Sequence, residues 1–83
     1  MHQNKPNPFN QNTIIEYEIP VNAVKGQLLI FDMQGTQLKK YDNLVKGKNS
    51  ITINGNELGA GMFLYSLILD GNEVDTKRMI LIN

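Results

Sequence analysis

The sequence predicts an all-β fold, an immunoglobulin-like antiparallel β-sandwich of about seven short strands. Apolar and polar residues alternate with a period of two along most of the 83 residues, and no apolar stripe with helical spacing competes with that pattern. Short apolar runs begin roughly 9 to 14 residues apart, and turns rich in Gly, Asn and Asp separate them. Regular short strands with such turns are typical of a two-layer sandwich.

The first half of the chain contains one strand followed by a hairpin. Residues 14–19 alternate isoleucine and tyrosine with glutamate, which predicts a half-buried strand. Residues 27–32 form a short apolar run, and a further strand is expected over residues 36–41. Asp32 and Gly35 occupy the first and fourth positions of a type I turn, so these two strands are expected to form a hairpin.

The second half contains three more predicted strands. Residues 50–54 alternate again, and residues 62–69 form the longest apolar stretch of the chain. Asp70 and Gly71 make a favoured hairpin turn, after which residues 74–82 return as the final strand.

A seventh strand is expected in one of two places, residues 44–49 or residues 57–58, because an immunoglobulin-like sandwich usually has about seven. The period of two also predicts which side chains point into the core. The expected inward set is Ile15, Tyr17, Ile19, Leu28, Ile30, Leu38, Ile51, Ile53, Phe63, Tyr65, Leu67, Met79 and Leu81.

The chain is expected to divide into a tether with a Pro-Asn-Pro-Phe motif over residues 1–12 and a sandwich over residues 13–83. The first part is rich in Asn and Pro, as linkers often are. Eight basic and eight acidic residues give a net charge of zero, which argues against nucleic acid as a partner. There is no cysteine, so no disulfide can reinforce the core.

Residues that could carry enzyme chemistry are sparse. His2 is the one histidine and lies at the start of the chain, so no Ser-His or Cys-His pair is expected and the protein is predicted not to be an enzyme. Gly59 and Gly61 are expected to make a tight turn rather than a phosphate-binding loop, because a strand follows instead of a helix. Residues 70–75 hold three carboxylates and could bind calcium, but a plain turn is favoured because the spacing is not that of an EF-hand. No cofactor is predicted.

Four segments together resemble the type A C-terminal sorting domain of the bacterial type IX secretion system, over residues 5–83. Each segment alone has an ordinary strand or turn explanation, and the resemblance depends on their order and spacing. The segments are Asn7-Pro8-Phe9 with the strand ending at Ile19-Pro20, the apolar run that closes in Asp32-x-x-Gly35, the strand introduced by Gly59-Ala60-Gly61, and the final strand with its basic pair Lys77-Arg78.

This resemblance implies a domain whose work is to be recognised. The parent protein would enter the periplasm by a separate signal, and this domain would then engage the outer-membrane translocon in a Gram-negative bacterium of the Bacteroidetes. A sortase-like protease would cut upstream of the domain, leaving the cargo at the cell surface or outside the cell. The recognition candidates that it implies are Pro6, Asn7, Pro8, Phe9, Asp32, Gly35, Gly59, Gly61, Lys77 and Arg78.

Two other classes of function stay open on sequence grounds. The domain could be an accessory or glycan-binding sandwich of a surface protein, although it has no Trp to serve as a sugar platform. It could also be a structural module that pairs through an edge strand. We expect a monomer.

Overall fold

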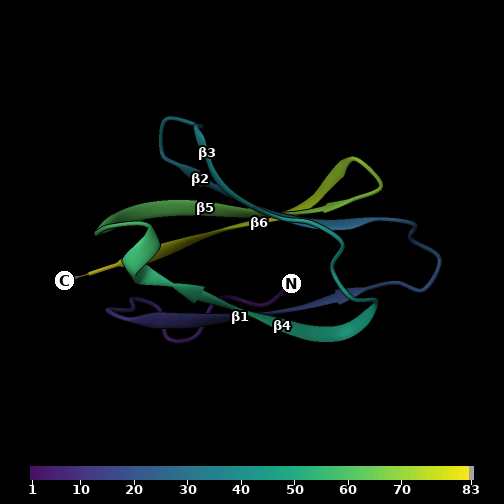
Figure 1. Cartoon of the computed structure of the whole chain (residues 1–83), viewed down its shortest axis with the longest axis horizontal. Coiled ribbons are helices and arrows are strands. Elements are labelled where there is room, and N and C mark those ends of the chain that lie inside the picture. Colours follow the sequence, from purple (N-terminus) through teal and green to yellow (C-terminus); the bar gives the residue numbers. More distant parts are fainter. Residues whose placement is uncertain (83) are drawn as a thin grey trace.

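The structure, a computed structural model, describes residues 1–82 and has two antiparallel sheets that face each other (Figure 1). One sheet has two strands in the order β1-β4, and the other has four in the order β3-β2-β5-β6. The prediction of an all-β sandwich is confirmed. The elements are β1 (Asn12–Ile19), β2 (Gly26–Asp32), β3 (Gln37–Tyr41), β4 (Gly47–Asn54), the 3-10 helix η1 (Gly55–Glu57), β5 (Gly61–Leu69) and β6 (Asn72–Leu81).

The N-terminal segment, defined here as residues 1–9, supplies a seventh extended stretch. Lys5 and Ile14 exchange backbone hydrogen bonds of 2.9 Å in each direction, so the segment pairs with the free side of β1. Phe9 then pairs with Leu81 of β6 in a parallel bridge. The segment therefore passes from the edge of one sheet to the edge of the other.

The expected position of the seventh strand is wrong in both alternatives. Residues 47–49 already belong to β4, which begins at Gly47, and residues 55–57 form η1. Nothing in the local pattern of the N-terminal segment marks it as a strand, because it pairs at isolated bridges rather than along a continuous ladder.

The core lies between the two sheets and contains most of the predicted inward set. Leu38 is the error, since its side chain is 41% exposed. The strands β2 and β3 shift register at Ile30, and Lys39 and Tyr41 of β3 stand opposite Ile30 and Leu28, on the core side of the sheet. Leu38 therefore points outward. Buried core side chains are Phe9, Ile15, Tyr17, Ile19, Ala23, Leu28, Ile30, Ile53, Phe63, Tyr65, Leu67, Met79 and Leu81, and Ile51 packs against them half-buried.

At two glycines an added side chain would come too close to neighbouring atoms. A Cβ on Gly55 would lie 2.6 Å from the backbone oxygen of Gln11, and one on Gly26 would lie 2.8 Å from Cδ1 of Ile19. A Cβ on Gly61 would make an ordinary contact, 3.8 Å from Cζ of Phe63, and the φ of +152° is what favours glycine there.

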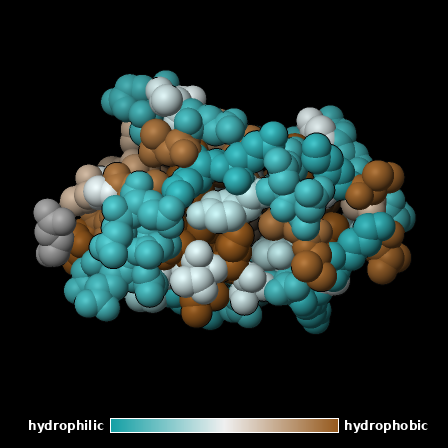
Figure 2. Space-filling view, viewed as in Figure 1, coloured by the Kyte–Doolittle hydropathy of each residue, from teal (hydrophilic) through white to brown (hydrophobic). Residues whose placement is uncertain are grey.

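The surface seen in Figure 2 is mostly hydrophilic, with hydrophobic residues at one end of the molecule, where Figure 1 places the turn between β1 and β2. Val21 and Val24 of that turn are 83% and 86% exposed. Within residues 1–82, no helix is long and apolar enough to cross a membrane.

Candidate recognition surface

The motifs at the two ends of the chain lie side by side in the structure. Phe9 N donates to the Ile80 carbonyl at 2.9 Å, and Ile82 N donates to the Phe9 carbonyl at 2.8 Å. The side chain of Asn7 adds a third contact, since its Oδ1 accepts from Ile80 N at 2.9 Å. These bonds join the Pro-Asn-Pro-Phe motif to the last strand, so the two motifs form one continuous feature only after folding.

The four residues of this motif divide between the core and the surface. Phe9 is 1% exposed and packs in the main core cluster with Leu81. Pro6, Asn7 and Pro8 are exposed. An aromatic side chain of this size contributes a large buried apolar area. Phe9 is therefore a structural anchor, and the three residues before it are the part that a partner could contact.

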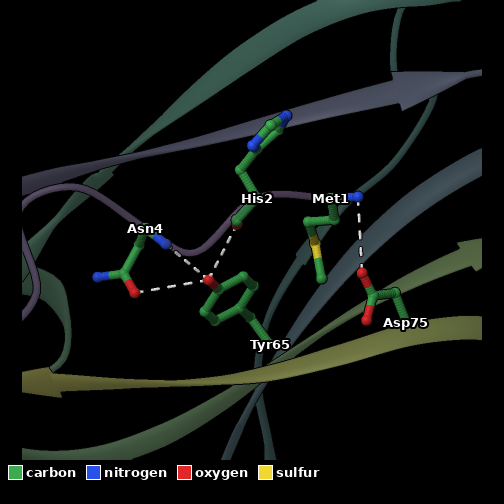
Figure 3. A network of polar contacts seen from close by, with 5 residues as sticks. All are labelled: Met1, His2, Asn4, Tyr65 and Asp75. Atoms are coloured by element: carbon green, nitrogen blue, oxygen red, sulfur yellow. Dashed lines mark hydrogen bonds and ion pairs between the residues drawn. The ribbon is translucent and has the colours of Figure 1, made fainter.

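A buried tyrosine holds the start of the chain against the four-stranded sheet (Figure 3). The backbone N of Asn4 donates to Oη of Tyr65 at 2.8 Å, and that hydroxyl donates to the carbonyl of His2 at 3.2 Å. Met1 N lies 3.5 Å from a carboxylate oxygen of Asp75. The first residues, expected as part of a tether, are thus bound to the sandwich at several points.

Asn4 also completes a small polar cluster inside the fold. Its Nδ2 donates to Thr13 Oγ1 at 3.0 Å and to the Pro6 carbonyl at 3.1 Å. Thr13 Oγ1 in turn donates to the same carbonyl at 2.8 Å. Both side chains are almost fully buried, and buried polar groups are tolerated only when they are hydrogen-bonded, as these are. The cluster fixes the path of the backbone just before Pro6.

The environment of Tyr65 raises the pKa of its phenol above the ordinary value. Burial is the main cause, because it disfavours the charged phenolate, and the nearby Asp75 carboxylate acts in the same direction. The hydrogen bond from Asn4 opposes these effects. The hydroxyl therefore stays protonated over the neutral range and keeps its role as a donor.

The turn between β2 and β3 forms as the sequence predicts. Gly35 N donates to the Asp32 carbonyl at 3.1 Å, and Gly35 has a φ of +90°. The carboxylate Oδ1 of Asp32 accepts from the backbone N of Gln34 at 3.0 Å and of Thr36 at 2.8 Å. Asp32 is thus used to close its own turn, and the turn projects from the sandwich (Figure 1).

Most of the recognition candidates gather at one end of the sandwich. Asp32 stands opposite Phe63, and Gly61 stands opposite Leu81, to which Phe9 is also paired. The end of β6, η1 and the β2–β3 turn all lie at this end, on the left of Figure 1. Strand pairing therefore brings together motifs that are up to about 70 residues apart in the sequence.

Lys77 and Arg78 do not form a joint basic site. Lys77 stands opposite Tyr65 and is half-buried on the core side of β6. Arg78 stands opposite Leu64 and is exposed on the other side. Successive residues of a strand point to opposite faces, so a basic dipeptide in a strand is divided between them.

The possible calcium site has a structural explanation. Oδ1 of Asp70 accepts from the backbone N of Val24 at 2.9 Å and of Lys25 at 2.8 Å. The carboxylate thereby holds the β1–β2 turn against the β5–β6 turn. Among residues 1–82, no group of three or more His, Cys, Asp or Glu side chains is arranged to hold a metal ion.

Two surface hollows were not anticipated from the sequence. The larger, of about 510 Å³, lies against β1 and β4, and the smaller, of about 270 Å³, is lined by amide side chains. Neither wall offers the exposed aromatic platform that sugar-binding sites commonly use. The linings are Met1, His2, Glu16, Tyr17, Glu18, Lys48, Asn49 and Ser50 for the larger, and Gln11, Asn12, Asn54 and Asn56 for the smaller.

Comparison with known families gives one match that covers nearly the whole chain. The family model described as "Secretion system C-terminal sorting domain" matches residues 6–83. No curated protein and no solved structure matches the chain. The matched region begins at Pro6, the first residue of the motif that pairs with the last strand.

Proposed function

The chain belongs to the family of secretion system C-terminal sorting domains, and on that premise we propose that it directs a parent protein through the outer-membrane translocon of type IX secretion. The family membership implies a C-terminal sorting signal, with export to the cell surface or the extracellular space of Gram-negative Bacteroidetes. The parent would cross the periplasm first. A sortase-like protease would then cut the parent chain upstream of the domain, which releases the cargo or anchors it at the cell surface.

The observation that carries this proposal is the pairing of the two terminal motifs. The hydrogen bonds of Asn7 and Phe9 with Ile80 and Ile82 exist only in the folded domain. Because the candidate residues converge at one end of the sandwich, we propose that the translocon reads a folded surface and not a linear peptide. The exposed recognition candidates at this end are Pro6, Asn7, Pro8, Gly35, Gly59 and Gly61.

The domain is proposed to act without catalysis and without a cofactor. In this proposal the partners are the translocon, the protease and an upstream cargo domain of the parent chain, and the domain itself is a monomer. The glycan-binding alternative gains no support from the hollows, since the smaller one offers amides alone.

A secretion assay tests the proposal. The chain would be fused to the C-terminus of a reporter that carries its own export signal, in a bacterium with a working type IX system. The fusion is expected at the cell surface, whereas the reporter alone stays in the periplasm. The same fusion in a strain without the translocon should also stay in the periplasm, and surface display there would refute the proposal.

Replacing Lys77 and Arg78 by alanine refines the test. Both residues lie on a strand whose pairing does not depend on their side chains, so the variant should fold. If it is retained in the periplasm, the basic residues are part of the signal. Wild-type display would place recognition elsewhere on the domain.

A further inference from the structure

The outer faces of the two sheets differ in chemistry. On the two-stranded sheet, Glu16 and Glu18 stand opposite Ser50 and Lys48, which is the polar surface expected of a sandwich in water. On the four-stranded sheet, the outward residues of β2 and β5 are mainly apolar. A face of this kind is unusual on a sheet that has no further layer over it.

Strand pairing shows that these apolar residues form one patch. Phe31 stands opposite Leu64, and Met62 stands opposite Ile80. Residues directly opposite each other in antiparallel strands lie on the same face within contact distance. Leu29 extends the patch along β2. The apolar outer face is defined here as Leu29, Phe31, Met62, Leu64 and Ile80.

The charge next to this patch is positive. Arg78 stands opposite Leu64 and is exposed, and within residues 1–82 it makes no ion pair. Lys40, opposite Leu29, already has a carboxylate partner in Asp42 at 3.5 Å. The guanidinium lies on the edge strand β6, beside the apolar face, and favours a partner that supplies a carboxylate, because Arg binds carboxylates through a bidentate pair.

We propose that the apolar outer face with Arg78 is the docking surface for a protein component of the secretion machinery, whose contacting surface is apolar and presents a carboxylate to Arg78. This rests on the proposed function. The face is continuous with the end where the sorting motifs converge, since the backbone N of Ile80 donates to Asn7 Oδ1 and its carbonyl accepts from Phe9 N. Of the two basic residues, Arg78 contacts the partner and Lys77 does not, because Lys77 points to the core side.

The test compares variants of the two outer faces in the reporter fusion. Leu64→Ser and Arg78→Glu alter the proposed surface. Ile14→Ser and Lys48→Glu are the matched controls on the other sheet, and Ile14, at 47% exposed, is at least as accessible as Met62 at 39%. Melting of each purified variant shows whether it folds. If Leu64→Ser does not fold, Met62→Ser replaces it.

The proposal predicts that Leu64→Ser and Arg78→Glu each lower surface display about tenfold or more, since buried apolar anchors and facing charges dominate such interfaces. The two control variants should reach surface display within about twofold of the wild-type fusion, because substitutions outside an interface have little effect on binding. Arg78→Ala should lose less than Arg78→Glu, because only the latter brings like charges together. Equal losses of surface display in the two Arg78 variants would refute the proposal that the partner presents a carboxylate to Arg78.

Other occupants of the face give different results. Concentration-dependent dimerisation that Leu64→Ser abolishes, measured by sedimentation, would show a second copy on the face and overturn the proposal. Flotation with anionic phospholipid vesicles that Leu64→Ser abolishes would show a lipid surface and also overturn it. If the wild-type fusion is displayed and both face variants match it, the docking surface is wrong while the sorting function stands. If the wild-type fusion is never displayed, the sorting function fails and the docking proposal fails with it.

Discussion

Replacing Phe9 by alanine should destabilise the domain strongly, although Phe9 lies in a segment whose composition resembles a linker. The ring is 1% exposed and belongs to the main core cluster. The backbone N of Phe9 bonds to Ile80 and its carbonyl bonds to Ile82. These two bonds hold the ring over the end of the core.

The size of the effect follows from this burial. Truncation of a buried Phe to Ala costs about 3–5 kcal/mol of unfolding free energy, through lost transfer energy and the cavity left behind. We expect about 3 kcal/mol, the lower end, because a site near a chain terminus can collapse more easily than one at the centre of a sheet. For a domain of this size each kcal/mol lowers the Tm by about 4–8 °C, so the expected loss is about 12–24 °C.

Thermal unfolding followed by circular dichroism, with urea unfolding as a second measurement, would test this expectation. Asn10→Ala is the matched control, because Asn10 is the next residue and is exposed. It should change the Tm by no more than about 3 °C, as surface substitutions usually do. If Phe9→Ala melts together with this control, the ring is not part of the core and the N-terminal segment is a tether over its whole length.

Three further predictions concern single side chains. Gly55→Ala should lower the free energy of unfolding by about 2 kcal/mol, because its Cβ would meet a backbone oxygen. Gly61→Ala should lower it by about 1 kcal/mol, because only the φ is unfavourable there. If urea unfolding ranks the two variants in the opposite order, the packing at Gly55 is contradicted. Tyr65→Phe should cost about 1–3 kcal/mol by leaving Asn4 N unsatisfied. Burial raises the pKa of Tyr65 above its usual 10.0, so the folded state holds the phenolic proton more tightly than the unfolded chain. The stability that this supplies is complete below about pH 10 and is lost as the pH rises through the folded pKa. The Tm, measured as a function of pH, should therefore fall less steeply above pH 10 in Tyr65→Phe than in the wild type. Asp70→Asn should lower the Tm by a few degrees, about 1 kcal/mol, through weaker bonds to the β1–β2 turn, and EDTA should leave the wild-type Tm unchanged, whereas a large drop would show a bound metal.

The sequence alone determined the fold class and the position of most strands. Alternation with a period of two and the residues that favour turns are local properties, and a strand such as β1 needs only its own residues to reveal which side is apolar. The hairpin turn at Asp32 and Gly35 was predictable for the same reason, since its hydrogen bonds close within five residues.

The apolar outer face leaves a signal in the sequence. Residues 62–69 are mainly apolar at odd and at even positions, which indicates that both faces of that strand are apolar. Alternation identifies two faces and cannot say what covers each of them. Only the pairing of β5 with β2 and β6 shows that Phe31, Leu64 and Ile80 share a face.

Long-range contacts decided the rest, and no local pattern encodes them. Phe9 and Asn4 are buried because the segment around them pairs with β1 and β6, whose partner residues lie as much as about 70 positions away. Lys77 and Arg78 are separated because β6 packs one face on the core. The candidate recognition surface is therefore a product of strand pairing, and its residues become neighbours only when the two ends of the chain meet.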